Sequence, residues 1–226
     1  AVEGSSYYAS PLLYKENGFK EKVHAEKLIE DLTNKTAVVK TVDKGISKKR
    51  APLLFNLAEL QAECSKRFKI SPDETLQVAQ DLYERKLTTY PRTDARVLSS
   101  AVAKEISKNI RGLRSFEPVA PFVQNIMEHG LYKNIGKSSY TDDSKITDHY
   151  AIIPTGQVNE YKSLTELQKR VYELIVRRFL SIFYPPAQYQ TVKLTIGIEK
   201  ESFFAGAKVL KVPGYLEIAG KPDNKE

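Results

Sequence analysis

The sequence predicts an α+β protein of more than one domain, in which a helical domain is inserted into a β-rich module. Both ends of the chain hold short runs of β-branched and aromatic residues, whereas the middle holds amphipathic helical segments with capping residues. An insertion explains the order β, then α, then β. We place the first β-rich part at residues 1–52, the helical domain at 53–160 and the second β-rich part at 161–226.

The composition narrows the class of protein. A chain of 226 residues, 41% hydrophobic and 28% charged, is typical of globular proteins and long enough for one or two cores. No apolar run approaches the roughly 18 residues of a membrane span, and the sequence opens without a signal-peptide pattern. The single cysteine, Cys64, excludes an intrachain disulfide. The formal charge of +7 favours a polyanionic partner.

The N-terminal part contains two predicted strands and a predicted helix. An aromatic and apolar run over residues 5–15 predicts a strand, and apolar residues at helical spacing over 24–32 predict a short helix. The β-branched residues of 36–42 predict a second strand, followed by a basic loop. The basic side chains of this stretch are a solvated surface or a phosphate-contacting one, and both readings stay open: Lys40, Lys44, Lys48, Lys49 and Arg50.

Capping residues mark the helices of the middle part. Asn56, with Glu59 three positions on, predicts the start of a helix that buries Cys64 as a small core residue. Ser71-Pro72-Asp73-Glu74 predicts another start, for a helix that ends near Lys86. Such a pair is compatible with a helix-turn-helix unit. Further helices are expected from Ser99 or Ser100 to Ile110 and, briefly, over 122–127 within an otherwise irregular stretch from 111 to 160.

The C-terminal part begins with a helix and continues with strands. Ser163 with Glu166 predicts the helix start, and Pro185-Pro186 the end. Alternating apolar residues from 192 to 198 predict a half-buried strand. Residues 203–218 predict further strand, with turns at Gly206 and at Pro213-Gly214.

One short segment places unusual chemistry together. Tyr90-Pro91-Arg92-Thr93-Asp94 offers a phenol, a guanidinium and a carboxylate within five positions. Pro91 pushes the residue before it toward extended backbone, in which residues two apart face the same side. Tyr90, Arg92 and Asp94 can therefore face one target, with the phenol attacking a phosphodiester that the guanidinium holds. A tyrosine that simply packs at the exit of a helix is the structural alternative.

Three segments resemble type IA DNA topoisomerases, most closely the bacterial topoisomerase III branch. Residues 87–99, LTTYPRTDARVLS, resemble the segment that carries the active-site tyrosine of that family. Residues 148–155, DHYAIIPT, resemble the family's Asp-His-His-Ala-Ile-Ile-Pro-Thr, with Tyr150 in place of its second histidine. A softer match covers Leu54 to Gln61. The order and the spacing agree across all three.

The resemblance implies a winged-helix-like helical domain inserted into a β-rich gate arch. It implies that Tyr90 forms a transient 5′-phosphotyrosine link with single-stranded DNA, without ATP, so that a strand passes and the break is resealed. Arg92 would hold the scissile phosphate, and His149 would bind phosphate or relay a proton. DNA contacts are expected from six further residues: Asp94, Thr93, Ser99, Lys48, Lys49 and Arg50.

The family's Mg²⁺ is bound by a TOPRIM domain, for whose acidic cluster we find no counterpart in these residues. We therefore expect a fragment that holds no metal of its own, partners a TOPRIM domain of the same parent, binds DNA and does not relax it alone. We expect a cytoplasmic, nucleoid-associated monomer without a membrane partner. One alternative is a noncatalytic DNA-binding module. Another is a different tyrosine enzyme, although the dispersed arginines of recombinases and the paired histidines of nickases are not visible.

Overall fold

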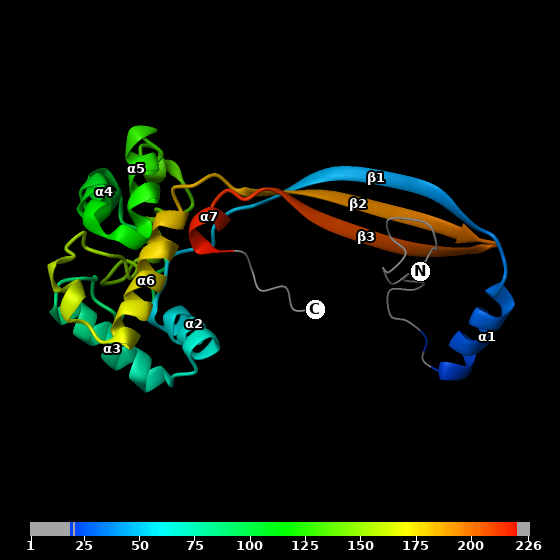
Figure 1. The fold of residues 1–226 in the computed structure, drawn as a ribbon, viewed down its shortest axis with the longest axis horizontal. Helices are drawn as coiled ribbons and strands as arrows, with labels where there is room; N and C mark the ends of the chain where they lie inside the picture. Colours follow the sequence, from blue (N-terminus) through cyan, green and yellow to red (C-terminus); the bar gives the residue numbers. More distant parts are fainter. Residues whose placement is uncertain (1–18, 20, 221–226) are drawn as a thin grey trace. The chain divides into compact units, whose positions relative to one another are not determined.

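The chain forms two compact units in a computed structural model that describes residue 19 and residues 21–220 (Figure 1). Unit 1 combines Ala1–Lys49 with Gln188–Val212, and unit 2 combines Arg50–Ala187 with Pro213–Glu226. The strand expected over residues 5–15 lies outside the described residues. The domain boundaries near residues 52 and 160 stay a prediction, and by their contacts residues 161–187 lie in unit 2.

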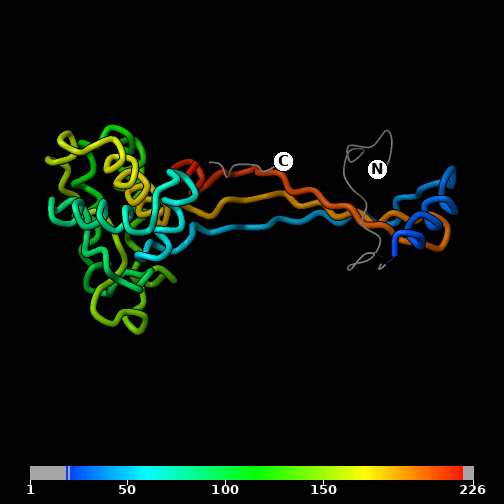
Figure 2. Tube along the Cα trace, turned by 90° about the horizontal axis from the view of Figure 1, so that it is seen from below, coloured from blue at the N-terminus to red at the C-terminus, as the bar shows by residue number. Residues whose placement is uncertain are grey.

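Unit 1 is a three-stranded sheet with one helix. Helix α1 (Lys22–Leu32) precedes β1 (Ala37–Lys49), and the strand order is β1-β2-β3, with β2 (Ala187–Ile198) antiparallel to β3 (Glu201–Val212). Figures 1 and 2 both show the three strands running alongside one another. Leu194, Ile196 and Ala205 form its small core. The sheet confirms the predicted strands on both sides of the helical region.

Three details of unit 1 and of the residues that follow β3 differ from the prediction. Strand β1 continues to Lys49, so Lys44, Lys48 and Lys49, expected in a loop, are on a strand, and Arg50 directly follows it. The turn expected at Gly206 is wrong, because Gly206 pairs with Lys193 and the flanking residues 205 and 207 pair with 194 and 192, so the strand continues through the glycine. The turn at Pro213-Gly214 is confirmed by a φ of +52° at Gly214, but the residues after it form the short helix α7 (Leu216–Ala219) instead of strand.

Unit 2 is helical, and its capping residues largely stand where the sequence predicts them. The helices are α2 (Leu57–Phe68), α3 (Pro72–Glu84), α4 (Ser100–Gly112), α5 (Ala120–Glu128), α6 (Glu166–Ser181) and α7. Ser71 and Glu74 form a reciprocal capping box at the start of α3, and the Asn56 side chain accepts a hydrogen bond from the Glu59 N–H. Helix α6 is capped by Thr165 with Gln168, so the prediction of Ser163 is wrong.

Helix α6 forms the centre of the unit 2 core. It packs against α3 and α7, and its buried side chains include Val171, Tyr172, Ile175 and Phe179. Cys64 is fully buried, as expected of a core residue, and burial raises the pKa of its thiol to about 11. Five short 3-10 segments connect the helices: Leu113–Ser115, Glu117–Val119, Ile135–Lys137, Asp143–Lys145 and Asn159–Ser163.

No helix within the described part of the chain combines the length and apolar character that crossing a membrane requires.

Candidate active site

The segment after α3 is fixed by pairing with the second of the two sequence motifs. The Thr89 N–H donates to the Ile153 carbonyl at 3.0 Å, and the Thr89 hydroxyl donates to the Ala151 carbonyl at 3.0 Å. The same hydroxyl accepts from the Ile153 N–H at 3.0 Å, and Thr88 forms a bridge with Pro154. These bonds join the two motifs directly before Tyr90.

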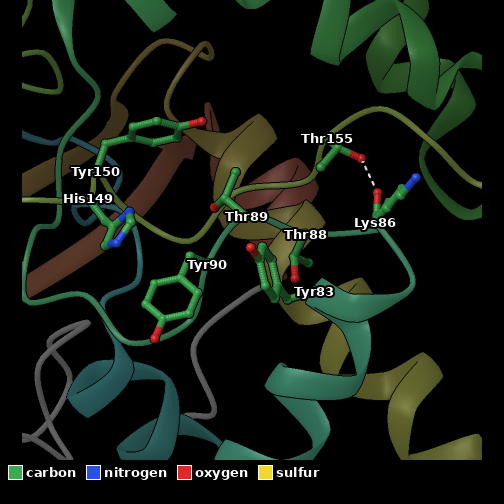
Figure 3. A pocket seen from close by; sticks show the side chains of 8 residues that line it. All are labelled: Tyr83, Lys86, Thr88, Thr89, Tyr90, His149, Tyr150 and Thr155. Carbon is green, nitrogen blue, oxygen red and sulfur yellow. Dashed lines mark hydrogen bonds between the residues drawn. The ribbon is translucent and has the colours of Figure 1, made fainter.

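Tyr90 lines a cavity of about 350 Å³ that lies wholly within unit 2 (Figure 3). His149 and Tyr150 lie on one side of Tyr90 in this view, and Lys86 and Thr155 on the other. No acidic side chain is among the residues that line the cavity, which are Tyr83, Lys86, Thr88, Thr89, Tyr90, His149, Tyr150 and Thr155. Its two basic groups make the cavity suited to an anionic ligand.

Aromatic contacts surround the half-buried ring of Tyr90. Its centroid lies 4.6 Å from that of His149, with a tilt of 49°, and 5.3 Å from that of Tyr83, in edge-to-face geometry. Burial raises the pKa of the Tyr150 hydroxyl, so this side chain stays a neutral phenol. The structure therefore brings together Tyr90 and His149 from separate motifs, and it adds Tyr83 of α3.

Arg92 and Asp94 share one side of the segment, as its alternation predicts. Both are exposed, whereas Pro91, Thr93 and Ala95 are buried. Arg92 takes part in none of the ion pairs found among the described residues, so no salt bridge with Asp94 holds it there. Neither residue lines the cavity of Tyr90. The free guanidinium is available to an anion at the surface beside Tyr90.

Thr93 and Ser99 have structural partners. The Thr93 hydroxyl donates to the His149 carbonyl at 2.8 Å and accepts from the Ala95 N–H at 3.1 Å. The Ser99 hydroxyl accepts from the Val102 N–H at 3.2 Å and caps α4. Thr93 thus connects the tyrosine segment to the histidine segment, and Ser99 starts the next helix.

None of the three basic residues expected to contact DNA is among the residues that line this cavity. Lys48 and Lys49 end β1 in unit 1, and Arg50 is the first residue of unit 2; all three are exposed.

Lys86, Thr88 and Thr155 line the cavity but were not singled out from the sequence. Lys86 follows α3 with a φ of +60°, and the Thr155 hydroxyl donates to its carbonyl. The Thr88 hydroxyl is buried and has no hydrogen-bond partner among the described residues. Thr88 and Thr155 belong to the two matched segments, and Lys86 directly precedes the first of them. Their pairing is tertiary, so no local pattern indicated that they meet.

The described residues do not fit a metal site. Nowhere in residues 21–220 do three or more His, Cys, Asp or Glu side chains come together as a metal would need.

Comparison with known proteins identifies the family. Residues 4–226 match the family model described as DNA topoisomerase. The chain is 37% identical over 204 residues to DNA topoisomerase 3 of Bacillus subtilis, covering 88% of the chain and 28% of that relative. It is 34% identical over 200 residues to DNA topoisomerase 3 of Bacillus cereus strain ATCC 14579, covering 88% of the chain and 27% of the relative.

A solved structure shares the fold. Full-length topoisomerase I from Thermotoga maritima matches with a TM-score of 0.65 and 24% identity, over 96% of this chain and 35% of that one. The chain thus spans 27–35% of the length of these proteins. The tyrosine motif, the histidine motif and these matches agree, and the chain belongs to the type IA DNA topoisomerase family.

Proposed function

We propose that the chain supplies the DNA-cleaving tyrosine of a type IA DNA topoisomerase, with Tyr90 as the nucleophile. The observation that carries this proposal is the place of Tyr90 in a cavity without acidic lining, in ring contact with His149. Relatives named DNA topoisomerase 3 support the assignment.

The reaction is a reversible transesterification. The Tyr90 oxygen attacks the phosphorus of a single-stranded DNA phosphodiester and loses its proton, and a new P–O bond forms. The P–O3′ bond breaks, and the leaving 3′ oxygen takes up a proton. The phosphodiester energy is kept in the 5′-phosphotyrosine bond, so resealing after strand passage needs no ATP.

The surrounding residues supply charge and position. Arg92 is exposed and unpaired among the described residues, and it holds the oxygens of the scissile phosphate. His149, in contact with the Tyr90 ring, binds phosphate or relays the proton. Asp94 orients Arg92 or a nucleotide, while Thr93 and Ser99 act near the strand by fixing the local backbone.

Other parts of the proposal concern the whole protein. Lys48, Lys49 and Arg50 contact DNA phosphates outside the cavity, as their exposure allows. A TOPRIM domain of the same parent provides Mg²⁺, since the described residues form no metal-binding group. The protein acts as a cytoplasmic, nucleoid-associated monomer, and the chain alone binds DNA without relaxing it.

Covalent trapping tests the proposal. Single-stranded DNA labelled at its 3′ end is mixed with the chain, and separately with the longer protein that we propose contains it, with and without Mg²⁺. After denaturation we expect labelled longer protein, and no label when Tyr90→Phe replaces the nucleophile. Tyr83→Phe is the matched control, because it removes a phenol hydroxyl from the same cavity.

Two results would contradict the assignment of Tyr90 as the nucleophile. An adduct that persists in the Tyr90→Phe protein would mean another nucleophile. Binding of single strands with no adduct under any condition would favour the noncatalytic DNA-binding module. Efficient relaxation of supercoiled plasmid by the chain alone would overturn the part of the proposal that assigns essential residues to another domain.

A further inference from the structure

Lys86 stands at the edge of the Tyr90 cavity, on the opposite side of Tyr90 from His149 in Figure 3. It is exposed, and none of the ion pairs found in the described part of the chain involves it. No acid lines the cavity to neutralise its ammonium. An uncompensated cation at the edge of a cavity favours an anionic ligand.

The backbone of Lys86 is in a conformation that glycine adopts more easily. Its φ is +60°, and it follows Arg85, the C-cap of α3, at a position where helices commonly place a left-handed glycine. Two hydrogen bonds hold its backbone: the Lys86 N–H donates to the Tyr83 carbonyl at 2.8 Å, and the Thr155 hydroxyl donates to the Lys86 carbonyl. The Thr155 N–H donates to the carbonyl of the next residue, Leu87, at 3.0 Å. The position of this lysine is therefore fixed by the same 151–155 segment that fixes Thr89.

The backbone conformation alone does not identify a function, because Lys69 shares it. Lys69 is the C-cap of α2, with a φ of +59°, and it is also exposed. Lys69 does not line the cavity. What distinguishes Lys86 is its place beside Tyr90, so the two lysines form a matched pair for experiment.

We propose that Lys86 is a substrate-binding residue whose ammonium holds a backbone phosphate of single-stranded DNA next to the phosphate that Tyr90 attacks. The inference rests on the proposed function, since it assumes that the cavity receives a DNA strand. His149 and Lys86 then hold the strand on both sides of the nucleophile. A cavity of about 350 Å³ suits an unpaired nucleotide rather than a duplex.

The test compares Lys86→Gly with Lys69→Gly in the chain. Each variant removes one charge at a left-handed position, so folding and net charge change alike. Affinity for a fluorescent single-stranded oligonucleotide is measured over a range of salt concentrations, with duplex DNA as the second arm. For Lys86→Gly we expect several-fold weaker binding and a slope of log K against log salt that is smaller in magnitude by about 0.7, as for one lost phosphate contact.

For Lys69→Gly we expect the affinity for single strands and the salt slope to stay unchanged. For both variants we expect unchanged binding of duplex DNA and a melting temperature at or above that of the unsubstituted chain. Three results would overturn the role of Lys86. They are equal salt slopes in the two variants, an equal loss of affinity for duplex DNA and for single strands, and no binding of single strands by the unsubstituted chain. Covalent trapping through Tyr90 is read separately, so it can succeed when the Lys86 result fails, and the reverse.

Discussion

The rings of Tyr90 and His149 lie 4.6 Å apart, centroid to centroid, and are tilted by 49°. The two residues come from different motifs, and the hydrogen bonds of Thr89 and Thr93 hold their segments together. The phenol and the imidazole thus meet because two backbone segments pair.

Replacing His149 by alanine should slow formation of the covalent adduct by about 10²-fold or more, because a positioned acid–base group contributes at least this much. His149 is exposed, so the free energy of unfolding should change by no more than about 0.5 kcal/mol. The adduct rate with labelled single-stranded DNA is the measurement. His129→Ala is the control, because His129 is also exposed but lies outside the cavity. Equal rates in the two variants would reduce His149 to a packing neighbour of Tyr90.

Thr93→Val should both destabilise the protein and slow cleavage. The change keeps the side-chain shape but removes the hydroxyl from the His149 carbonyl and the Ala95 N–H. Loss of a buried hydrogen-bond partner costs about 1–3 kcal/mol of unfolding free energy. Urea unfolding and the adduct rate are measured together, and Thr93→Ser should restore most of both. A slow adduct rate in Thr93→Val at wild-type stability would instead favour direct contact of Thr93 with DNA.

Local signals predicted most helix starts correctly. The Asn56 and Ser71 caps are fixed by neighbouring residues alone, so the sequence was sufficient. For the start of α6 the sequence was not sufficient, because Ser163 with Glu166 and Thr165 with Gln168 both fit a capping box. The Gln168 side chain is buried and donates to Asp81 of α3 at 3.0 Å, a tertiary contact that favours the second pair.

The residues of the site also fall into those that the sequence predicted and those that only tertiary contacts reveal. The motif residues Tyr90 and His149 were predicted to act together, and the structure places them in contact. Lys86 and Thr155 meet through the pairing of segments far apart in sequence, which no local pattern reveals. Similarly, glycine is a residue type typical of turns, and the place of Gly206 in a strand is shown only by its pairing with Lys193.

The cap of α6 can be tested directly. Thr165→Ala should lower the free energy of unfolding by about 1 kcal/mol, since the Thr165 hydroxyl accepts from the Gln168 N–H at 3.3 Å. Ser163→Ala should change it by less than about 0.5 kcal/mol, because the exposed Ser163 side chain caps no α-helix. Thermal or urea unfolding of the two variants measures both changes. A larger loss of unfolding free energy in Ser163→Ala would favour Ser163 as the cap, as the sequence predicts.

Gly112→Ala tests the packing of α4 against Gly156. An added Cβ would lie 2.7 Å from the Cα of Gly156, the residue after Thr155, and Gly156 has a φ of +94°. In an unhindered helix the change from glycine to alanine stabilises by about 0.5–1 kcal/mol, so the sign of the effect is informative. We expect a loss of about 1–3 kcal/mol in urea unfolding, because overpacking must displace backbone. Gly136→Ala is the control, since its nearest contact would be the Ala103 Cβ at 3.9 Å. Stabilisation by Gly112→Ala would show that α4 and the Thr155 segment are less closely packed, and that the position of Lys86 is held by its own hydrogen bonds alone.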